Sequence, residues 1–289
     1  MEQESNHSAE SALEMLARAI EANLKTPTRE ENVVLLDAES ADDVMITADL
    51  HGHWDNYHQI MAIADLDAHP RRHLVMQEVC HGGPQYEGKH ACKSHLMLRE
   101  VAELKVKYPH RVHFILSNHE LSEMTDHPIA KDGKMVTLAF RMGISAEYGD
   151  ASDSVHEAYM TFIGSCPLAV RLPSGVLVTH SAPQNVDTEG FDATVFNRVL
   201  EPDDIRKGGD VFRMVWGRDY REENAQAFAE ATGAKIFIHG HTPCDEGFDV
   251  PNKSQIILDC CAQPASYVIL PMDADLTQEQ VVERIKLLE

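Results

Sequence analysis

The chain has 289 residues, of which 43% are hydrophobic, so it is long enough to bury a substantial core. Its 47 acidic and 25 basic residues give a formal net charge of −22, which argues against a nucleic-acid partner and against anionic membranes, because both need clustered Lys and Arg. The sequence contains no apolar run of roughly 18 residues, the length of a membrane-spanning helix, and its acidic first residues lack a signal-peptide pattern. A cytoplasmic location is therefore expected, and the six cysteines, which form no Cys-x-x-Cys pair, are expected to be free thiols.

The first predicted element is an amphipathic helix over residues 8–25. Leu13, Leu16 and Ile20 recur at helical spacing, and Pro27 ends the pattern. We expect this helix to pack on the rest of the domain, and a helix that binds a partner is the alternative.

Several predicted strands are followed at once by polar residues. The strands span residues 44–48, 73–77, 111–116, 176–179 and 235–238, and the polar residues after them include Asp49, His51, Glu78, Asn118, His119, His180 and His241. Because α/β proteins place their chemistry at the carboxyl ends of strands, these side chains are expected to converge at one sheet edge. Carboxylate, amide and imidazole ligands of this kind suit a pair of hard-to-borderline divalent metals.

The remaining elements complete a mixed pattern of helices and strands. Helices are predicted over residues 55–68, capped by Asp55, over residues 89–107 and 222–232, and over residues 277–288 at the end of the chain. A mostly helical insertion is predicted at about 120–165, strands 168–172 and 176–179 form a hairpin, and further strands span 255–259 and 266–270. Strands of mixed connection with helices between them predict an α/β (α+β) protein with two sheets and flanking helices, in one domain over residues 1–289.

Five motifs in this order resemble those of the calcineurin-like metallophosphoesterases, and within them the phosphoprotein phosphatase branch. The motifs are Ala48-Asp49-Leu50-His51-Gly52, Gln77-Glu78-Val79-Cys80-His81-Gly82-Gly83, Ser117-Asn118-His119-Glu120, Thr179-His180 and Gly240-His241. The wider superfamily has a second histidine two residues after the last Gly-His, and Pro243 at that position favours the phosphoprotein phosphatase branch.

The resemblance implies a four-layer αββα sandwich and a role for each motif residue. The implied ligands are Asp49 and His51 for one metal, Glu78 as the bridge, and Asn118, His180 and His241 for the second metal. His119 is implied as the general acid, and a hydroxide between the metals as the nucleophile. We expect two divalent ions, with Mn²⁺ first and Fe, Zn²⁺ or Ni²⁺ as alternatives.

The second motif departs from the family pattern. His81 stands where the family has the aspartate that orients the general acid, and Gly82 stands where it has an arginine that grips phosphate. Candidates for the missing acid partner are His81 itself, Glu87 or another residue of the 81–90 loop. Candidates for the phosphate ligand are Arg218, which follows Trp216-Gly217, and Arg221 behind it.

The expected function is hydrolysis of phosphomonoesters, with a phosphoprotein as the family's usual substrate. Two alternatives stay open: a hydrolase of phosphoanhydrides such as dinucleoside polyphosphates or other small metabolites, and a catalytically weak metal-binding adaptor that has kept the site. The expected partner is a phosphorylated substrate, without nucleic acid or membrane, and the sequence leaves the oligomeric state undetermined.

Overall fold

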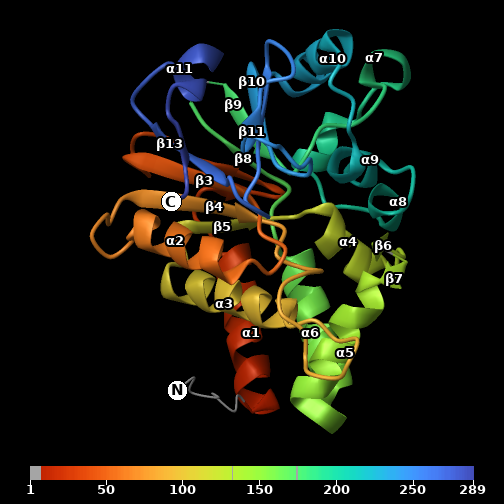
Figure 1. Ribbon diagram of the computed structural model, residues 1–289. Coiled ribbons are helices and arrows are strands. Elements are labelled where there is room, and N and C mark those ends of the chain that lie inside the picture. The colour runs from red at the N-terminus through yellow and green to blue at the C-terminus, as the bar shows by residue number, and fades with distance from the viewer. Residues whose placement is uncertain (1–7, 132, 174) are drawn as a thin grey trace.

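A computed structural model describes residues 8–131, 133–173 and 175–289, and its core consists of two β-sheets packed face to face with helices outside them (Figure 1). Helices α1, α2 and α3 cover the outer side of one sheet, while α7, α9 and α10 lie beside the other (Figure 1). This arrangement confirms the predicted four-layer sandwich of mixed sheets flanked by helices. No helix within the described ranges is long and apolar enough to span a membrane.

The five-stranded sheet carries three of the five motifs. Its strand order is β14-β13-β3-β4-β5, with bounds Ile285–Leu287, Ser266–Pro271, Asp43–Asp49, Arg72–Gln77 and Val112–Ile115. Strands β3, β4 and β5 run parallel, and nearly all of their residues are buried, as expected for a sheet covered on both faces. Their carboxyl ends therefore meet at one edge.

The seven-stranded sheet carries the other two motifs. Its order is β1-β2-β8-β9-β10-β12-β11, with bounds Arg29–Glu30, Val33–Leu35, Ala169–Arg171, Val176–Thr179, Ile236–His239, Gln255–Leu258 and Phe248–Asp249. Strands β8 and β9 pair antiparallel, which confirms the predicted hairpin, and β9 and β10 pair parallel. A separate two-stranded hairpin consists of β6 (Ala130–Lys131) and β7 (Lys134–Met135).

The helices follow the predicted order closely in the first half of the chain. The longer ones are α1 (Ala9–Leu24), α2 (Trp54–Ala64), α3 (Ser94–Lys107), α4 (Asn118–Thr125), α5 (Val136–Tyr148), α6 (Ser152–Gly164) and α10 (Glu222–Thr232). Shorter ones are η1 (Gly149–Ala151), α7 (Val186–Glu189), η2 (Ala193–Phe196), α8 (Pro202–Ile205), α9 (Asp210–Trp216) and α11 (Gln278–Val282). Helix α1 packs against α3 and α6, as expected for a helix that packs on the rest of the domain.

Three predicted elements are corrected. The helix predicted from residue 55 is capped by His53, whose ring accepts a hydrogen bond from the backbone of Asn56, and it ends at Ala64. The helix predicted from residue 89 begins at Ser94, because residues 84–93 form a loop closed by a bridge between Gln85 and Cys92.

The third correction concerns the end of the chain, predicted as one helix over residues 277–288. Only Gln278–Val282 is helical, behind a capping box at Thr277, and Ile285–Leu287 is strand β14. Pairing with β13 satisfies the backbone groups of this segment, and that pairing prevails over the helical spacing of its apolar residues.

Candidate active site

Glu78 lies at the centre of a cluster of motif side chains. It follows β4 directly and is 1% exposed. Its Oε1 lies 2.9 Å from Nε2 of His51, and its Oε2 lies 2.8 Å from Nε2 of His180. The two carboxylate oxygens thus face two different imidazoles, one from each sheet, which is the geometry required of a ligand shared by two cations.

The second imidazole belongs to a compact group of three ligands. Nε2 of His180 lies 2.6 Å from Oδ1 of Asn118 and 3.1 Å from Nδ1 of His241, and the same Asn118 oxygen lies 3.0 Å from that His241 nitrogen. Asp49 is adjacent, because its Oδ2 accepts a hydrogen bond of 2.9 Å from the backbone N–H of His241 and its Oδ1 lies 3.7 Å from Nδ1 of His180. All six predicted metal ligands therefore meet at one place.

The donor atoms of this cluster fit divalent cations. Among the buried atoms that lack a hydrogen-bond partner in the described part of the chain, three belong to this cluster: Asp49 Oδ1, Glu78 Oε2 and His241 Nε2. The 2.8 Å approach of His180 to Glu78 Oε2 is close enough for an ion pair but lacks hydrogen-bond geometry. Buried polar atoms are rarely left unpaired, so this convergence of free acceptors favours a bound cation. Two groups of side chains could each hold one ion: His51, Glu78 and His119 form the first, and Glu78, His180 and His241 form the second.

The electrostatics of the cluster point the same way. Burial lowers the pKa of His51, but the carboxylates of Glu78 and Asp49 outweigh it and raise that pKa to about 9. Burial and the nearby charge of Glu78 raise the pKa of Asp49 to about 7. Two buried carboxylates that raise each other's energy are stabilised by nearby positive charge, and divalent metal ions could supply that charge once the ligands have lost their protons.

The ligands sit in strained turns at the ends of their strands. His51, Glu78 and His241 have φ angles of 43°, 41° and 68°, in the left-handed region that non-glycine residues seldom adopt, at a cost of order 1–3 kcal/mol each. A Cβ atom at Gly82 would lie 2.1 Å from the carbonyl oxygen of His51, so no side chain fits there. The turn at Gly82, where the family has an arginine, is thus packed directly against the turn that carries His51.

The partner of the predicted general acid is identified by contact. Nδ1 of His119 lies 2.8 Å from Nδ1 of His81, and Nε2 of His81 lies 2.7 Å from Oε1 of Glu123, with the His81 and Glu123 side chains fully buried. The other ring nitrogen of His119, Nε2, lies 3.7 Å from Glu78. Of the candidates that the sequence left open, His81 is the one in contact with His119, whereas Glu87 is exposed.

Glu123 supplies a negative charge at the end of this chain of groups. Burial alone would raise its pKa, but the imidazole of His156 at 3.7 Å, the hydrogen bond from His81 and the charge of Arg141 lower that pKa below its ordinary value. Burial, together with the neighbouring imidazoles, lowers the pKa of His119 to about 3. The Glu123 carboxylate therefore lies against His81, on the side of that ring away from His119.

Three supporting residues escaped the sequence analysis. Glu123 follows His119 by four positions on α4, so helical spacing was the signal that could have identified it. Glu120 accepts hydrogen bonds of 2.9 Å from the backbone N–H groups of Val79 and Cys80 and so holds the turn after Glu78. Oε1 of Gln77 accepts from Nδ1 of His180 at 2.8 Å, which leaves Nε2 free as a ligand.

The two predicted arginines are placed differently. Arg218 donates a hydrogen bond of 3.0 Å to the carbonyl oxygen of His241 and is exposed, so it lies at the rim of the site. The guanidinium of Arg221 is instead engaged by Asp187 and Asp219. The structure brings Arg218 to the ligand cluster and holds Arg221 in ion pairs beyond it.

The fold and the site together define a metal-dependent hydrolase of the sandwich type. A family model of calcineurin-like phosphoesterases matches residues 43–245, more than half of the chain, so the chain belongs to the calcineurin-like phosphoesterase family. Members of this family are hydrolases that act on phosphoric esters with divalent metals. The resemblance that the motifs predict is thereby confirmed.

Similar proteins extend this result. A probable serine/threonine-protein phosphatase of Encephalitozoon cuniculi is 24% identical over 272 residues, which cover 87% of this chain and 54% of that protein, so the chain spans about half the length of this curated relative. A solved serine/threonine phosphatase of Saccharomyces cerevisiae has a TM-score of 0.69 at 12% identity, covering 97% of this chain and 90% of that one. A cold-active protein-tyrosine phosphatase of a Shewanella species has a TM-score of 0.59 at 12% identity, covering 93% and 84%. Both solved structures share the fold.

Proposed function

We propose that this chain hydrolyses phosphomonoesters with two divalent metal ions. The observation that carries the proposal is Glu78, whose two oxygens lie within 2.9 Å of two imidazoles from different sheets. Asp49 and His51 would hold one ion with Glu78, and Asn118, His180 and His241 the other. When bound, such ions neutralise phosphate charge and make water acidic enough to be a nucleophile near neutral pH.

The residues around His119 would supply the proton that the leaving group needs. When the His81–His119 pair holds three protons, one lies between the two Nδ1 atoms, one is donated from His81 to Glu123, and one stays on His119 Nε2, which faces Glu78. Transfer of that last proton to the departing oxygen leaves a neutral pair. Glu123 would favour the loaded state, because its carboxylate stabilises the positive charge.

The exposed guanidinium of Arg218 beside His241 supports a role in binding the phosphate. Phosphoserine and phosphothreonine are candidate substrates, since the curated relative is named a serine/threonine-protein phosphatase.

The test uses metal-stripped protein, p-nitrophenyl phosphate and added Mn²⁺, with Fe²⁺, Zn²⁺ and Ni²⁺ in parallel. We expect metal-dependent turnover that falls by about 10²-fold or more in Asp49→Asn, because several kcal/mol of charge stabilisation depend on the ions. Asp203→Asn is the matched control, since that side chain is 92% exposed. Two metals bound per chain without turnover would contradict the proposal and favour a metal-binding adaptor.

A further inference from the structure

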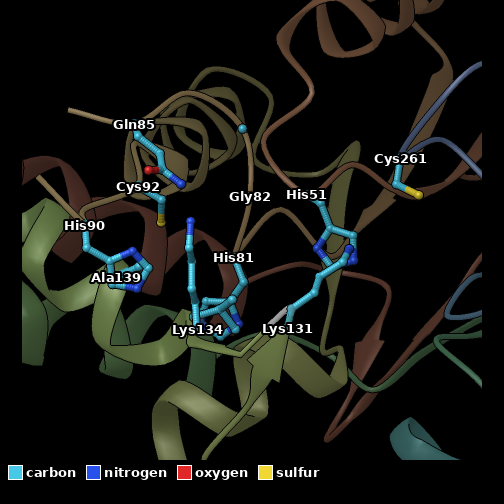
Figure 2. Close-up of a pocket in the computed structure, with 12 residues that line it drawn as sticks. His51, His81, Gly82, Gln85, His90, Cys92, Lys131, Lys134, Ala139 and Cys261 are labelled. Carbon is cyan, nitrogen blue, oxygen red and sulfur yellow. The ribbon is translucent and has the colours of Figure 1, made fainter. Parts of the chain in front are cut away.

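A pocket of about 350 Å³ lies beside the candidate metal site (Figure 2). His51 and His81, which belong to that site, share its lining with Lys131 and Lys134 of the β6–β7 hairpin. The side chain of Lys131 extends toward the ring of His51, and that of Lys134 extends between His81 and His90 (Figure 2). The pocket is therefore continuous with the metal site, and one molecule can occupy both.

The charge of this pocket is opposite to that of the chain. Acidic residues outnumber basic ones by 47 to 25 overall, yet none of the twelve described residues that line the pocket is acidic. Its charged side chains are those of Lys131 and Lys134. A recess lined by one sign of charge concentrates ligands of the other sign, so the pocket favours an anion.

The two lysines face each other across the β6–β7 hairpin. Lys131 and Lys134 are direct register partners in the antiparallel β6–β7 pair. Both side chains are exposed and line the pocket, so the hairpin presents two cations to an anion bound there.

The far wall of the pocket is fixed by hydrogen bonds. The hydroxyl of Tyr86 donates to Oε2 of Glu147 at 2.8 Å, and the backbone N–H of Cys92 donates to the carbonyl oxygen of Ala139 at 2.9 Å. A Cβ atom at Gly143 would lie 2.0 Å from the carbonyl oxygen of Cys92, so helix α5 packs directly against this loop. The pocket is consequently a preformed recess, as small-molecule sites usually are.

We propose that this pocket binds a second anionic group, a phosphate or a carboxylate, on a small substrate whose phosphoester is hydrolysed at the metal site. The proposal rests on the phosphoesterase function above and narrows its substrate class. Small-molecule sites measure roughly 300–1,000 Å³, so a recess of about 350 Å³ suits a compact metabolite better than a protein segment.

The experiment compares esters that differ only in the second group: phenyl phosphate, para-carboxyphenyl phosphate and para-phenylene bisphosphate. We expect the wild-type protein to prefer the doubly anionic esters by roughly tenfold in kcat/KM, through KM, as for one or two charge-assisted hydrogen bonds. Combining Lys131→Met with Lys134→Met is expected to abolish that preference and leave phenyl phosphate turnover within about twofold. The two doubly anionic esters distinguish a phosphate from a carboxylate.

Lys286→Met is the matched control, since Lys286 is exposed on the edge strand β14. Equal kcat/KM for the singly and doubly anionic esters in the wild type would overturn the proposal, as would equal losses on all esters in the double variant. A lysine-dependent preference for an acidic phosphopeptide over the small esters would overturn the choice of a small substrate.

A binding measurement separates this proposal from the function on which it rests. Calorimetry with benzenephosphonate and para-benzenediphosphonate requires no turnover. Tighter binding of the diphosphonate than of the monophosphonate, lost in the double lysine variant, would support the subsite even if no ester reacted. Failure of every ester to react would count against the phosphoesterase function alone. Equal binding of both phosphonates would overturn the subsite.

Discussion

Two neighbouring strands of this protein carry two pairs of histidines in very different surroundings. His73 on β4 and His113 on β5 lie near the start of the strands, with His73 Nδ1 2.9 Å from His113 Nε2. His81 and His119 follow the ends of the same strands and are 2.8 Å apart. The nitrogen–nitrogen distances within the two pairs are nearly equal. We therefore expect the charge of each pair to depend on the group that contacts the other ring nitrogen of His73 or His81.

The group behind each pair sets its charge. Behind His73 is the carbonyl oxygen of Ser40, and burial, together with the cations Arg111 and Lys105, lowers the pKa of His73 to about 4. Behind His81 is the carboxylate of Glu123, which stabilises positive charge. We therefore expect the His73–His113 pair to act in core packing and the His81–His119 pair, which adjoins a carboxylate, to hold a proton for catalysis.

The strongest way to break this comparison is to remove one histidine from each pair. His119→Ala is expected to lower kcat/KM on an alkyl phosphate by about 10²–10⁴-fold, because the alkoxide leaves only with a proton. The loss on p-nitrophenyl phosphate should be much smaller, since nitrophenolate leaves unaided. His113→Ala is expected to lower stability without changing turnover of the folded protein, and equal losses for the two variants would contradict the distinction.

Removing the Glu123 carboxylate should make the His81–His119 pair a weaker proton donor without abolishing proton transfer. Glu123→Gln is expected to reduce turnover of alkyl phosphates by roughly 30-fold, about 2 kcal/mol, the value of a hydrogen bond to a charged group. The ratio of rates on alkyl and aryl esters is the readout, because a simple loss of folded protein would lower both rates alike. Glu157→Gln on α6 is the control, and an unchanged ratio in Glu123→Gln would exclude the role of the carboxylate.

The packed pair should make the fold sensitive to acid. Because the pKa of His73 is about 4 in the folded state and about 6.5 when unfolded, the unfolded chain binds more protons between these values. Stability is therefore lost as the pH falls from about 6.5 toward 4, and His73 accounts for about 2 kcal/mol between pH 7 and 5. Urea unfolding of wild type and His73→Asn at both pH values tests this, and an equal pH dependence would refute it.

The smallest expected effect concerns a third imidazole, that of His51, and the pH dependence of metal binding. Carboxylates raise the pKa of His51 to about 9, so a proton must leave before a metal binds there. Between pH 7 and 8, the Mn²⁺ dissociation constant is expected to fall by about tenfold per proton displaced. Calorimetric titration at the two pH values measures it, and an unchanged constant would show that this histidine is already neutral.

The convergence of the proposed metal ligands could be predicted from sequence because each lies at or shortly after the end of a buried strand. Asp49 ends β3, Glu78 directly follows β4 and Asn118 lies three residues beyond β5, and the parallel topology brings such positions together. Glu123 could not be found from strand ends, because it lies inside helix α4. Its role depends on where that helix begins and on its contact with His81. Strand β14 was missed because its pairing with β13 is a tertiary contact that the local pattern does not encode.

The packing of Gly143 against Cys92 limits how this protein can change over evolutionary time. The loop that carries His81 is joined to α5 through that contact, and the backbone N–H of His81 also donates to Ser94 at the start of α3. Lengthening this loop to admit a larger ligand would displace the histidine that contacts the acid. New ligand preferences are therefore more accessible through substitutions on the β6–β7 hairpin, whose side chains can vary while the contact between His81 and His119 stays in place.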